Sequence, residues 1–429
     1  MNIGSYITSL RPRKVEHSIL ISIFLYSLGD FLGYNVHEKV GALFSLLGFC
    51  LFLKILLFKK KYFPLQGWSL FFYLLLIIDI IIITIYTFLF SKSELFFSES
   101  IKEKLYTLSG SSFVLPSIMP LMLLLFRKDH QMDIGYFVRF MTGLAVLYLC
   151  LYPFAFFHML FFQYSTRGYF GQEGSYGDFV TNSSLHISAF MTPFIMYYFR
   201  RYITDRQWLY SMLVSIGALL IAIYTARRGR TVTYLMYYGF FYLLYFIKNH
   251  STSKMLLIFR GILVLLLIAL VVIYNWDGFF SLIVERGTED TRSGVELSFF
   301  MDMDEQSWIW GRGWFGQYFD LGTGEYRAGL ETGYLTLILR GGMIYLSCYM
   351  LILLFSAIRG LFCSKNIFVK SFAVMILMSL FELYPFGWPA FDFKFFVIWM
   401  GVLICNSKYY LKMDESRVKS IFIKGRSIL

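Results

Sequence analysis

Long apolar runs recur along the whole chain, and they constrain its fold more strongly than any other feature. About twelve can be drawn, near 18–34, 40–58, 68–90, 109–126, 136–162, 184–199, 208–226, 231–247, 255–275, 332–357, 367–384 and 395–410. About 20 apolar residues cross one bilayer, and 58% of the 429 residues are hydrophobic while 15% are charged. These features exclude a soluble globule and predict an all-α polytopic membrane protein with about 12 transmembrane helices.

The basic residues set the predicted orientation, because Lys and Arg collect in the cytoplasmic connections of membrane proteins. With the amino terminus inside, 22 of the 39 Lys and Arg residues fall in inside segments and 13 in outside segments. Both termini are therefore expected in the cytoplasm, and the first run, after Arg11, Arg13 and Lys14, is expected to act as a signal anchor. None of the five cysteines falls in a predicted outside segment, so we expect no disulfides.

No repeat and no low-complexity linker divides the chain, so residues 1–429 are expected to form a single transmembrane domain. The outside segment 276–331, between the ninth and tenth runs, is long and holds ten acidic residues from Asp277 to Glu325. Its four basic residues are all Arg, and guanidinium groups are preferred where a planar fork holds an oxyanion. Arg292 and Arg312 are therefore candidates for substrate binding, although some of these Arg are expected to pair with neighbouring carboxylates.

The short connection between the seventh and eighth runs is the clearest exception to the charge rule. It contains Arg227, Arg228 and Arg230 in the sequence RRGR, on the predicted outer side. A compact cationic corner with a Gly suits bidentate capture of phosphate or pyrophosphate. The alternatives are a helix end whose Arg side chains reach lipid headgroups, or a misassigned topology.

Three further motifs follow in order: DTRSG at 290–294, WIWGRGWFGQY at 308–318 and ETGYLTLILRGG at 331–342. With RRGR, over roughly residues 220–345, this order resembles the O-antigen polymerase and O-antigen ligase superfamily. The resemblance implies a GT-C-type membrane glycosyltransferase that uses undecaprenyl-pyrophosphate-linked sugars at the outer face of the bacterial inner membrane. It also implies that Arg228, in an Arg–Gly pair that opens a span, contacts the pyrophosphate.

Ligases of this superfamily usually carry a His–Asn pair where this chain has Glu331 and Thr332, and the long outer segment contains no His. The sequence therefore favours a polysaccharide polymerase that makes O-antigen, capsule or exopolysaccharide. An O-antigen ligase-type transferase to another acceptor and a lipid-linked oligosaccharide flippase stay as alternatives. The expected partners are the lipid-linked donor and acceptor, membrane lipids and, as an option, a chain-length regulator; no cofactor and no nucleic acid is expected.

Glu331 is the candidate catalytic base. A carboxylate at the entry to an apolar span is partly desolvated, which raises its pKa and strengthens it as a base, although the dipole at a helix start opposes that shift. The alternative is a plain helix-capping residue. Arg340 completes the expected binding set, but nine residues of helix place it on the face opposite Glu331 unless Gly341 and Gly342 introduce a distortion.

The remaining candidates are weaker. Asp302 and Asp304 form a DxD pattern, but they lie on the predicted outer side and without a Rossmann-like sheet, so no metal site is expected. The six histidines have no metal-ligand spacing and are expected to be interface or interhelical residues. Asp79 and Glu382 are carboxylates within apolar runs, where either function or interhelical hydrogen bonding accounts for them.

Overall fold

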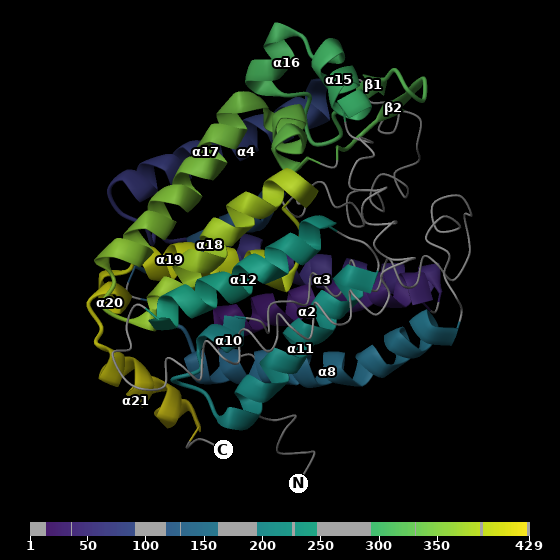
Figure 1. Ribbon diagram of the computed structural model, residues 1–429. Helices are drawn as coiled ribbons and strands as arrows, with labels where there is room; N and C mark the ends of the chain where they lie inside the picture. Colours follow the sequence, from purple (N-terminus) through teal and green to yellow (C-terminus); the bar gives the residue numbers. More distant parts are fainter. Residues whose placement is uncertain are drawn as a thin grey trace.

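The computed structural model describes residues 14–35, 37–90, 117–128, 130–161, 195–224, 228–246, 293–330, 332–386 and 389–426. These segments are almost entirely helical (Figure 1). The larger helices are α2 (Val15–Asn35), α3 (Glu38–Phe58), α4 (Trp68–Phe90), α8 (Ile134–Phe161), α11 (Asp205–Tyr224), α12 (Arg228–Phe246), α17 (Gly333–Cys363), α18 (Ile367–Phe386) and α19 (Phe393–Asn406). The shorter ones are α10 (Ile195–Tyr198), α15 (Ser293–Asp302), α16 (Glu305–Trp310), α20 (Lys408–Leu411) and α21 (Glu415–Arg426).

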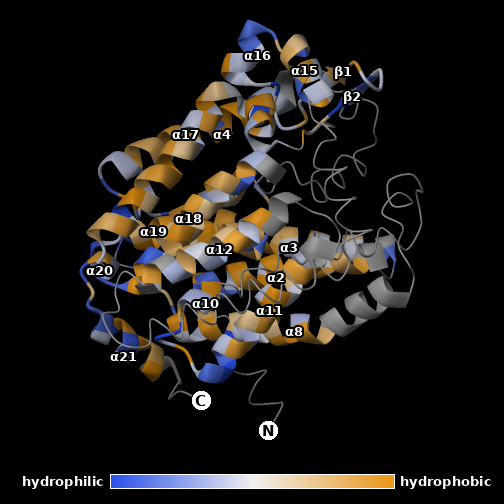
Figure 2. Cartoon of the chain, viewed as in Figure 1, coloured by the Kyte–Doolittle hydropathy of each residue, from blue (hydrophilic) through white to orange (hydrophobic). Residues whose placement is uncertain are grey.

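Four of the described helices are long and apolar enough to cross a membrane: Lys39–Phe58, Trp68–Thr87, Gly333–Cys363 and Ile367–Tyr384. Three shorter apolar helices accompany them, Val15–Gly29, Ile134–Cys150 and Phe393–Asn406. Apolar residues run along α17, α18 and α19, and hydrophilic residues gather toward α16, β2, α20 and α21 (Figure 2). The predicted class, a helical membrane protein, is confirmed; the predicted run 255–275 lies outside the described residues.

One predicted apolar run differs from expectation in its described part. The run near 109–126 was expected to be a transmembrane helix, but within 117–128 it forms the 3-10 helix η1 (Met119–Leu125). Pro120 stands in its first turn, where the missing N–H and the fixed φ disfavour a continuous α-helix. At about 2 Å per residue, such an element is too short to cross a membrane, and its side chains are buried against the bundle.

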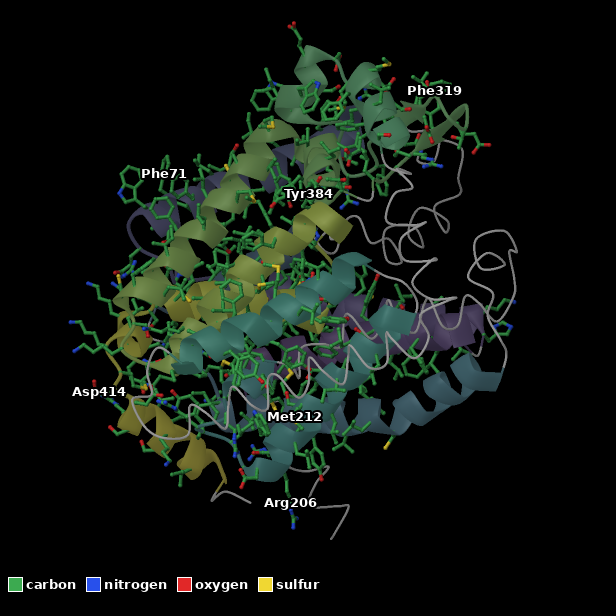
Figure 3. All side chains as sticks on the ribbon, viewed as in Figure 1. Phe71, Arg206, Met212, Phe319, Tyr384 and Asp414 are labelled. Atoms are coloured by element: carbon green, nitrogen blue, oxygen red, sulfur yellow. The ribbon has the colours of Figure 1, made fainter. Side chains whose placement is uncertain are left out.

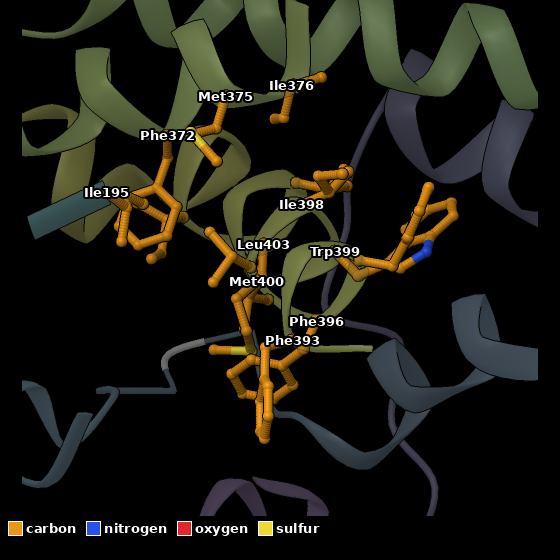
Figure 4. Packing of buried hydrophobic residues seen from close by; sticks show 14 of the residues in the cluster. Ile195, Phe372, Met375, Ile376, Phe393, Phe396, Ile398, Trp399, Met400 and Leu403 are labelled. Atoms are coloured by element: carbon orange, nitrogen blue, oxygen red, sulfur yellow. The ribbon is translucent and has the colours of Figure 1, made fainter. Parts of the chain in front are cut away.

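The core lies where α18 and α19 pack between the other helices (Figure 4). Phe372, Met375 and Ile376 of α18 and Phe396, Trp399 and Leu403 of α19 are all 3% exposed or less. Trp399 also meets Tyr349 of α17 edge to face, with ring centroids 5.9 Å apart. α19 is enclosed along its length and α18 over most of its length, which fits helices that are hydrophobic on nearly every face.

Small residues bring α2 and α3 into close contact. A Cβ atom on Gly29 would lie 2.3 Å from the backbone nitrogen of Ser45, and one on Gly48 would lie 2.6 Å from the Ser22 carbonyl oxygen. Tight approach of backbones through Gly and Ser is a usual way for helices to pack within a bilayer.

At one end of the bundle, the predicted inside connections contact one another. Asn366 donates through Nδ2 to the carbonyl oxygens of Tyr410 and Met413, and the Tyr410 hydroxyl accepts the Met132 N–H at 2.8 Å. Two histidine–carboxylate contacts reinforce this end, His17 to Asp133 and His130 to Glu16, each at 3.5 Å. Arg206 and Asp414 mark it in Figure 3, and Tyr384 marks the opposite end of α18.

The described part of the predicted long outer segment forms a folded unit at that opposite end together with the start of α17, and we call this unit the loop module (293–330 and 332–341). It contains α15, α16, an antiparallel hairpin of β1 (Tyr318–Asp320) and β2 (Glu325–Arg327), and the first part of α17. A separate small core holds it together, formed by Phe299, Met303, Tyr318, Leu330, Leu335, Ile338 and Leu339. At the start of the predicted tenth span, Leu335, Ile338 and Leu339 therefore pack within the loop module, while Leu337 packs in the main core.

Candidate functional site

Helix α17 is two successive helices, broken at Gly342. Gly342 has φ 69° and ψ −171°, a combination essentially confined to glycine. A Cβ atom there would lie 2.0 Å from the carbonyl oxygen of Ile309, at the end of α16. The second helix, 343–363, has the length of a membrane span, about 31 Å at 1.5 Å per residue.

The backbone of the WGRGW sequence (310–314) forms hydrogen bonds with the last turn of the helix before this break. The N–H of Arg312 donates to the Leu339 carbonyl oxygen at 2.7 Å, and the N–H of Gly313 donates to that of Arg340 at 3.0 Å. These are carbonyls that an unbroken helix would satisfy internally. Gly311 is required for the contact, since a Cβ atom there would lie 2.4 Å from the Arg340 carbonyl carbon. The two glycine motifs of the sequence are thus one structural unit.

Arg340 lies directly at this junction. It is 1% exposed, and it interacts electrostatically with Tyr345 beyond the break. Gly341 beside it packs against Ile83 of α4. The expected distortion at Gly341 and Gly342 is present, but it follows Arg340, so the helix from Gly333 to Arg340 stays regular. A buried cation is costly near a membrane and needs a role. Arg340 therefore either takes part in function or stabilises the break in α17.

Arg312 forms hydrogen bonds within the loop module. Its guanidinium donates to the Asp302 carboxylate and carbonyl, to the Gln317 carbonyl oxygen at 2.8 Å, and through Nε to the Ser307 hydroxyl at 3.2 Å. This set occupies all three nitrogen atoms, and the side chain is 24% exposed. Arg312 is a binding candidate from sequence, and these contacts show that it also holds the loop module together. Arg327 likewise pairs with Asp320, at 2.8 Å from Nε to Oδ2.

The two carboxylates of the DxD pattern have separate structural partners. Asp302 accepts from Arg312 and from the Phe319 N–H at 3.2 Å. Asp304 caps the start of α16 by accepting the Ser307 N–H at 2.9 Å, and hydrogen bonds from Ser307 lower its pKa. Within the part of the chain that the structure describes, no group of three or more His, Cys, Asp or Glu is placed to hold a metal ion.

Trp314 connects the loop module to the helical bundle through hydrogen bonds to α4. Its indole N–H donates to Thr84 at 3.0 Å, and its backbone N–H donates to Thr87 at 2.8 Å, both in α4. The ring is 1% exposed and meets Tyr345 edge to face. The module is therefore held by α4 and by the broken helix α17 together.

Glu331, the candidate base, lies outside the described residues, but both of its neighbours are placed. Leu330 is buried, and its N–H donates to the Thr336 hydroxyl at 3.3 Å. The Thr332 hydroxyl donates to the Glu296 carboxylate of α15. Glu296 is a carboxylate that sequence reasoning missed. The pairing depends on how α15 folds back on α17, which no local pattern indicates.

The cationic corner lies at the start of α12. Arg228 and Arg230 are in its first turn, while Arg227 and Arg292 lie outside the described residues. α12 packs against α18, and its first turn is at the end of the bundle where α18 finishes and the loop module lies (Figure 1). Tyr334, at the start of α17, donates its hydroxyl to the Leu380 carbonyl oxygen of α18. α18 thus connects the α12 corner to the segment that contains Glu331.

The two intramembrane carboxylates differ in their surroundings. Glu382, near the end of α18, forms an ion pair with Lys394 in the first turn of α19. Asp79 is 4% exposed in α4 and interacts electrostatically with Tyr345 and Cys348 of α17. Glu382 therefore has a partner on a neighbouring helix, which agrees with the interhelical interaction considered from sequence.

Comparison with known proteins found no matching family model, no similar curated protein and no similar solved structure.

Proposed function

We propose that this protein is a GT-C-type membrane glycosyltransferase with about twelve spans. It transfers a growing glycan from undecaprenyl pyrophosphate to a hydroxyl group of an incoming lipid-linked repeat unit. The reaction takes place at the outer face of the bacterial inner membrane, and both termini lie in the cytoplasm. The proposal rests first on the sequence resemblance.

The structural observation that supports it most is that the loop module contacts α18 at the end of the bundle where the first turn of α12 lies (Figure 1). The segment around Glu331 is fixed to α15 through Glu296 and Thr332 and to α18 through Tyr334. The first turn of α12, with Arg228, lies at the same end of α18 (Figure 1). A base and a cationic corner on one side of a helical bundle are what transfer from a lipid pyrophosphate requires.

In this mechanism Glu331 accepts the proton of the acceptor hydroxyl group as that oxygen attacks the anomeric carbon of the donor. The bond between the anomeric carbon and the pyrophosphate oxygen breaks, and the configuration inverts. Arg228, with Arg227 and Arg230, stabilises the negative charge that builds on the departing pyrophosphate. Pyrophosphate is already a good leaving group, so the mechanism does not depend on a metal ion.

The experiment is complementation of a strain that lacks this protein with the Glu331→Gln and Arg228→Lys variants. Gln keeps the size of Glu but cannot take up a proton, and Lys keeps the charge of Arg but loses the bidentate fork. Loss of a general base costs about 10² to 10⁴ in rate, enough to reduce a glycan ladder to single repeat units. The matched control is Glu325→Gln, an exposed carboxylate of β2, which should keep the ladder.

A normal ladder from well-expressed Glu331→Gln protein would refute the mechanism. Repeat units that accumulate only on the cytoplasmic side would favour the flippase alternative. A normal ladder that is no longer joined to its outer acceptor would favour the ligase alternative.

A further inference from the structure

Five large apolar side chains of α15 and α16 face away from the core of the loop module. They are Leu297 (52% exposed), Phe300 (49%), Met301 (67%), Ile309 (49%) and Trp310 (51%), which we call the apolar edge. On α15 they follow the i, i+3, i+4 spacing of one helical face. Phe300 stacks on Trp308 of α16 with ring centroids 5.7 Å apart, so the two helices present one continuous edge.

This exposure is not explained by the fold of the module. The module already has its own core, and exposed apolar patches of this kind mark a site of interaction. Elsewhere on its surface two apolar side chains of the hairpin are also exposed, Leu321 (58%) and Tyr326 (64%), and the charged residues Asp304, Glu305 and Glu325 are exposed as well. The largest group of exposed apolar side chains in the module is therefore the one on α15 and α16.

The apolar edge continues the lipid-facing surface of the bundle. Ile309 lies against the break at Gly342, beside Met343, which is 45% exposed at the start of the long helix of α17. Gly313 lies beside the ring of Tyr86 in α4, and along α4 an exposed apolar stripe runs from Phe71 (Figure 3) through Ile78 and Ile82 to Ile85.

The length of α4 places the edge at the membrane boundary. Trp68 and Tyr86 are exposed at the two ends of this stripe, and the helix between them is about 27 Å long at 1.5 Å per residue. This matches a hydrocarbon layer of about 30 Å, at whose boundaries Trp and Tyr collect. Trp310 and Tyr86 therefore lie at one boundary and Trp68 at the other.

We propose that the loop module rests on the membrane, with the apolar edge inserted among the lipids of the leaflet nearest to it. The partner is a lipid surface held by apolar burial. Attraction to anionic headgroups is not its basis, because the described module holds the acidic residues Glu296, Asp302, Asp304, Glu305, Asp320 and Glu325 against Arg312, Arg327 and Arg340. This inference does not depend on the proposed activity.

The test uses nitroxide spin labels on single cysteines in lipid nanodiscs, with the exposed native residues Cys50, Cys150 and Cys363 replaced. Labels are placed at Met301 in the edge, at Ile82 as a lipid-facing control in α4, and at Glu325 as a water-facing control in β2. All three positions are exposed, so the substitutions should not disturb folding. Collision rates are measured with oxygen, which concentrates in lipid, and with a water-soluble nickel chelate.

The proposal predicts that the Met301 label collides with oxygen more than with nickel, as the Ile82 label does, whereas the Glu325 label shows the reverse. Nickel accessibility at Met301 equal to that at Glu325 would place the edge in water and overturn the proposal. Low collision rates with both reagents would show that protein covers the edge, a second copy or another partner, and would overturn it as well.

Discussion

At the scale of single residues, Gly342 has the most demanding position in the described structure. Its backbone conformation excludes other residues, and its α-hydrogen faces the end of α16 where a Cβ atom would meet the Ile309 carbonyl oxygen at 2.0 Å. The break in α17, the position of Arg340 and the attachment of the loop module all depend on this one site.

We expect Gly342→Ala to destabilise the protein strongly. The backbone conformation alone costs about 1–3 kcal/mol for a residue with a side chain, and the clash with Ile309 adds to that. The control is Gly143→Ala in α8, where a Cβ atom would meet nothing within 4 Å. In a helix this control should be neutral or stabilising, by about 0.5–1 kcal/mol. Thermal unfolding of the two detergent-purified variants makes the comparison, and equal melting temperatures would contradict the role of the break.

The break in α17 could be predicted in part from the sequence, whereas its contact with the WGRGW segment could not. A distortion at Gly341 and Gly342 was considered from the paired glycines, but its partner, the WGRGW backbone, lies about 30 residues earlier in the chain. Arg312 was predicted to bind substrate because its type suits an oxyanion. The structure shows that Arg312 also pairs with Asp302, ten residues earlier in the sequence, a contact that depends on the fold of α15 and α16.

At the scale of elements, the apolar runs predicted the helices well because continuous hydrophobicity of span length permits little else in a membrane. The 3-10 helix at Met119–Leu125 shows where this reasoning fails, since Pro120 outweighs an apolar sequence. The loop module shows another failure: Leu335, Ile338 and Leu339 lie in a predicted span, yet they pack with α15 and β1. Hydropathy alone cannot distinguish these two environments.

The junction of α2 and α8 at the opposite end of the bundle carries a pH-dependent contact. A hydrogen bond from His17 lowers the pKa of Asp133, just before α8. Since its folded pKa lies below the ordinary value of about 4, the charged carboxylate stabilises the fold above that pH. This contribution is lost as the pH falls from about 4 through the lower folded value.

We therefore expect Asp133→Asn to lower the stability at pH 7, by about 1–3 kcal/mol, because buried His17 exchanges a charged carboxylate acceptor for a neutral amide oxygen. The difference from the unmodified protein should shrink as the pH falls below about 4. Asp205→Asn is the control, since Asp205 is 87% exposed in its pair with Arg200 and such pairs contribute little. A difference that persists unchanged down to pH 3 would contradict the contact.

At the scale of the whole molecule, the bundle has two chemically distinct ends. One gathers the contacts among residues 14–17, 127–133, 199–206, 364–367 and 407–415, and the other carries the loop module and the start of α12. Hydropathy predicts that successive connections lie alternately at the two ends of the bundle. This prediction groups the same segments at each end as the structure does. Which of the two ends faces the cytoplasm is inferred from the distribution of Lys and Arg alone.

That direction can be measured with a membrane-impermeant maleimide on intact cells. We expect a cysteine at Glu325, in the loop module, to react from outside. A cysteine at Asp414, at the opposite end (Figure 3), should react only after the membrane is permeabilised. The reverse pattern would place the loop module in the cytoplasm and remove the basis for an outer active site.

The most direct measurement of the central claim is polymerisation by the purified protein in proteoliposomes, supplied with undecaprenyl-pyrophosphate-linked repeat units. The account predicts glycans of many repeat units, formed equally well with a metal chelator, with release of undecaprenyl pyrophosphate for each bond made. It predicts single repeat units from the Glu331→Gln and Arg228→Lys proteins and full activity from Glu325→Gln. If the unmodified, folded protein left every repeat unit unjoined, the protein would not be the polymerase proposed here. If the Glu331→Gln protein polymerised as well as the unmodified protein, Glu331 would not be the catalytic base.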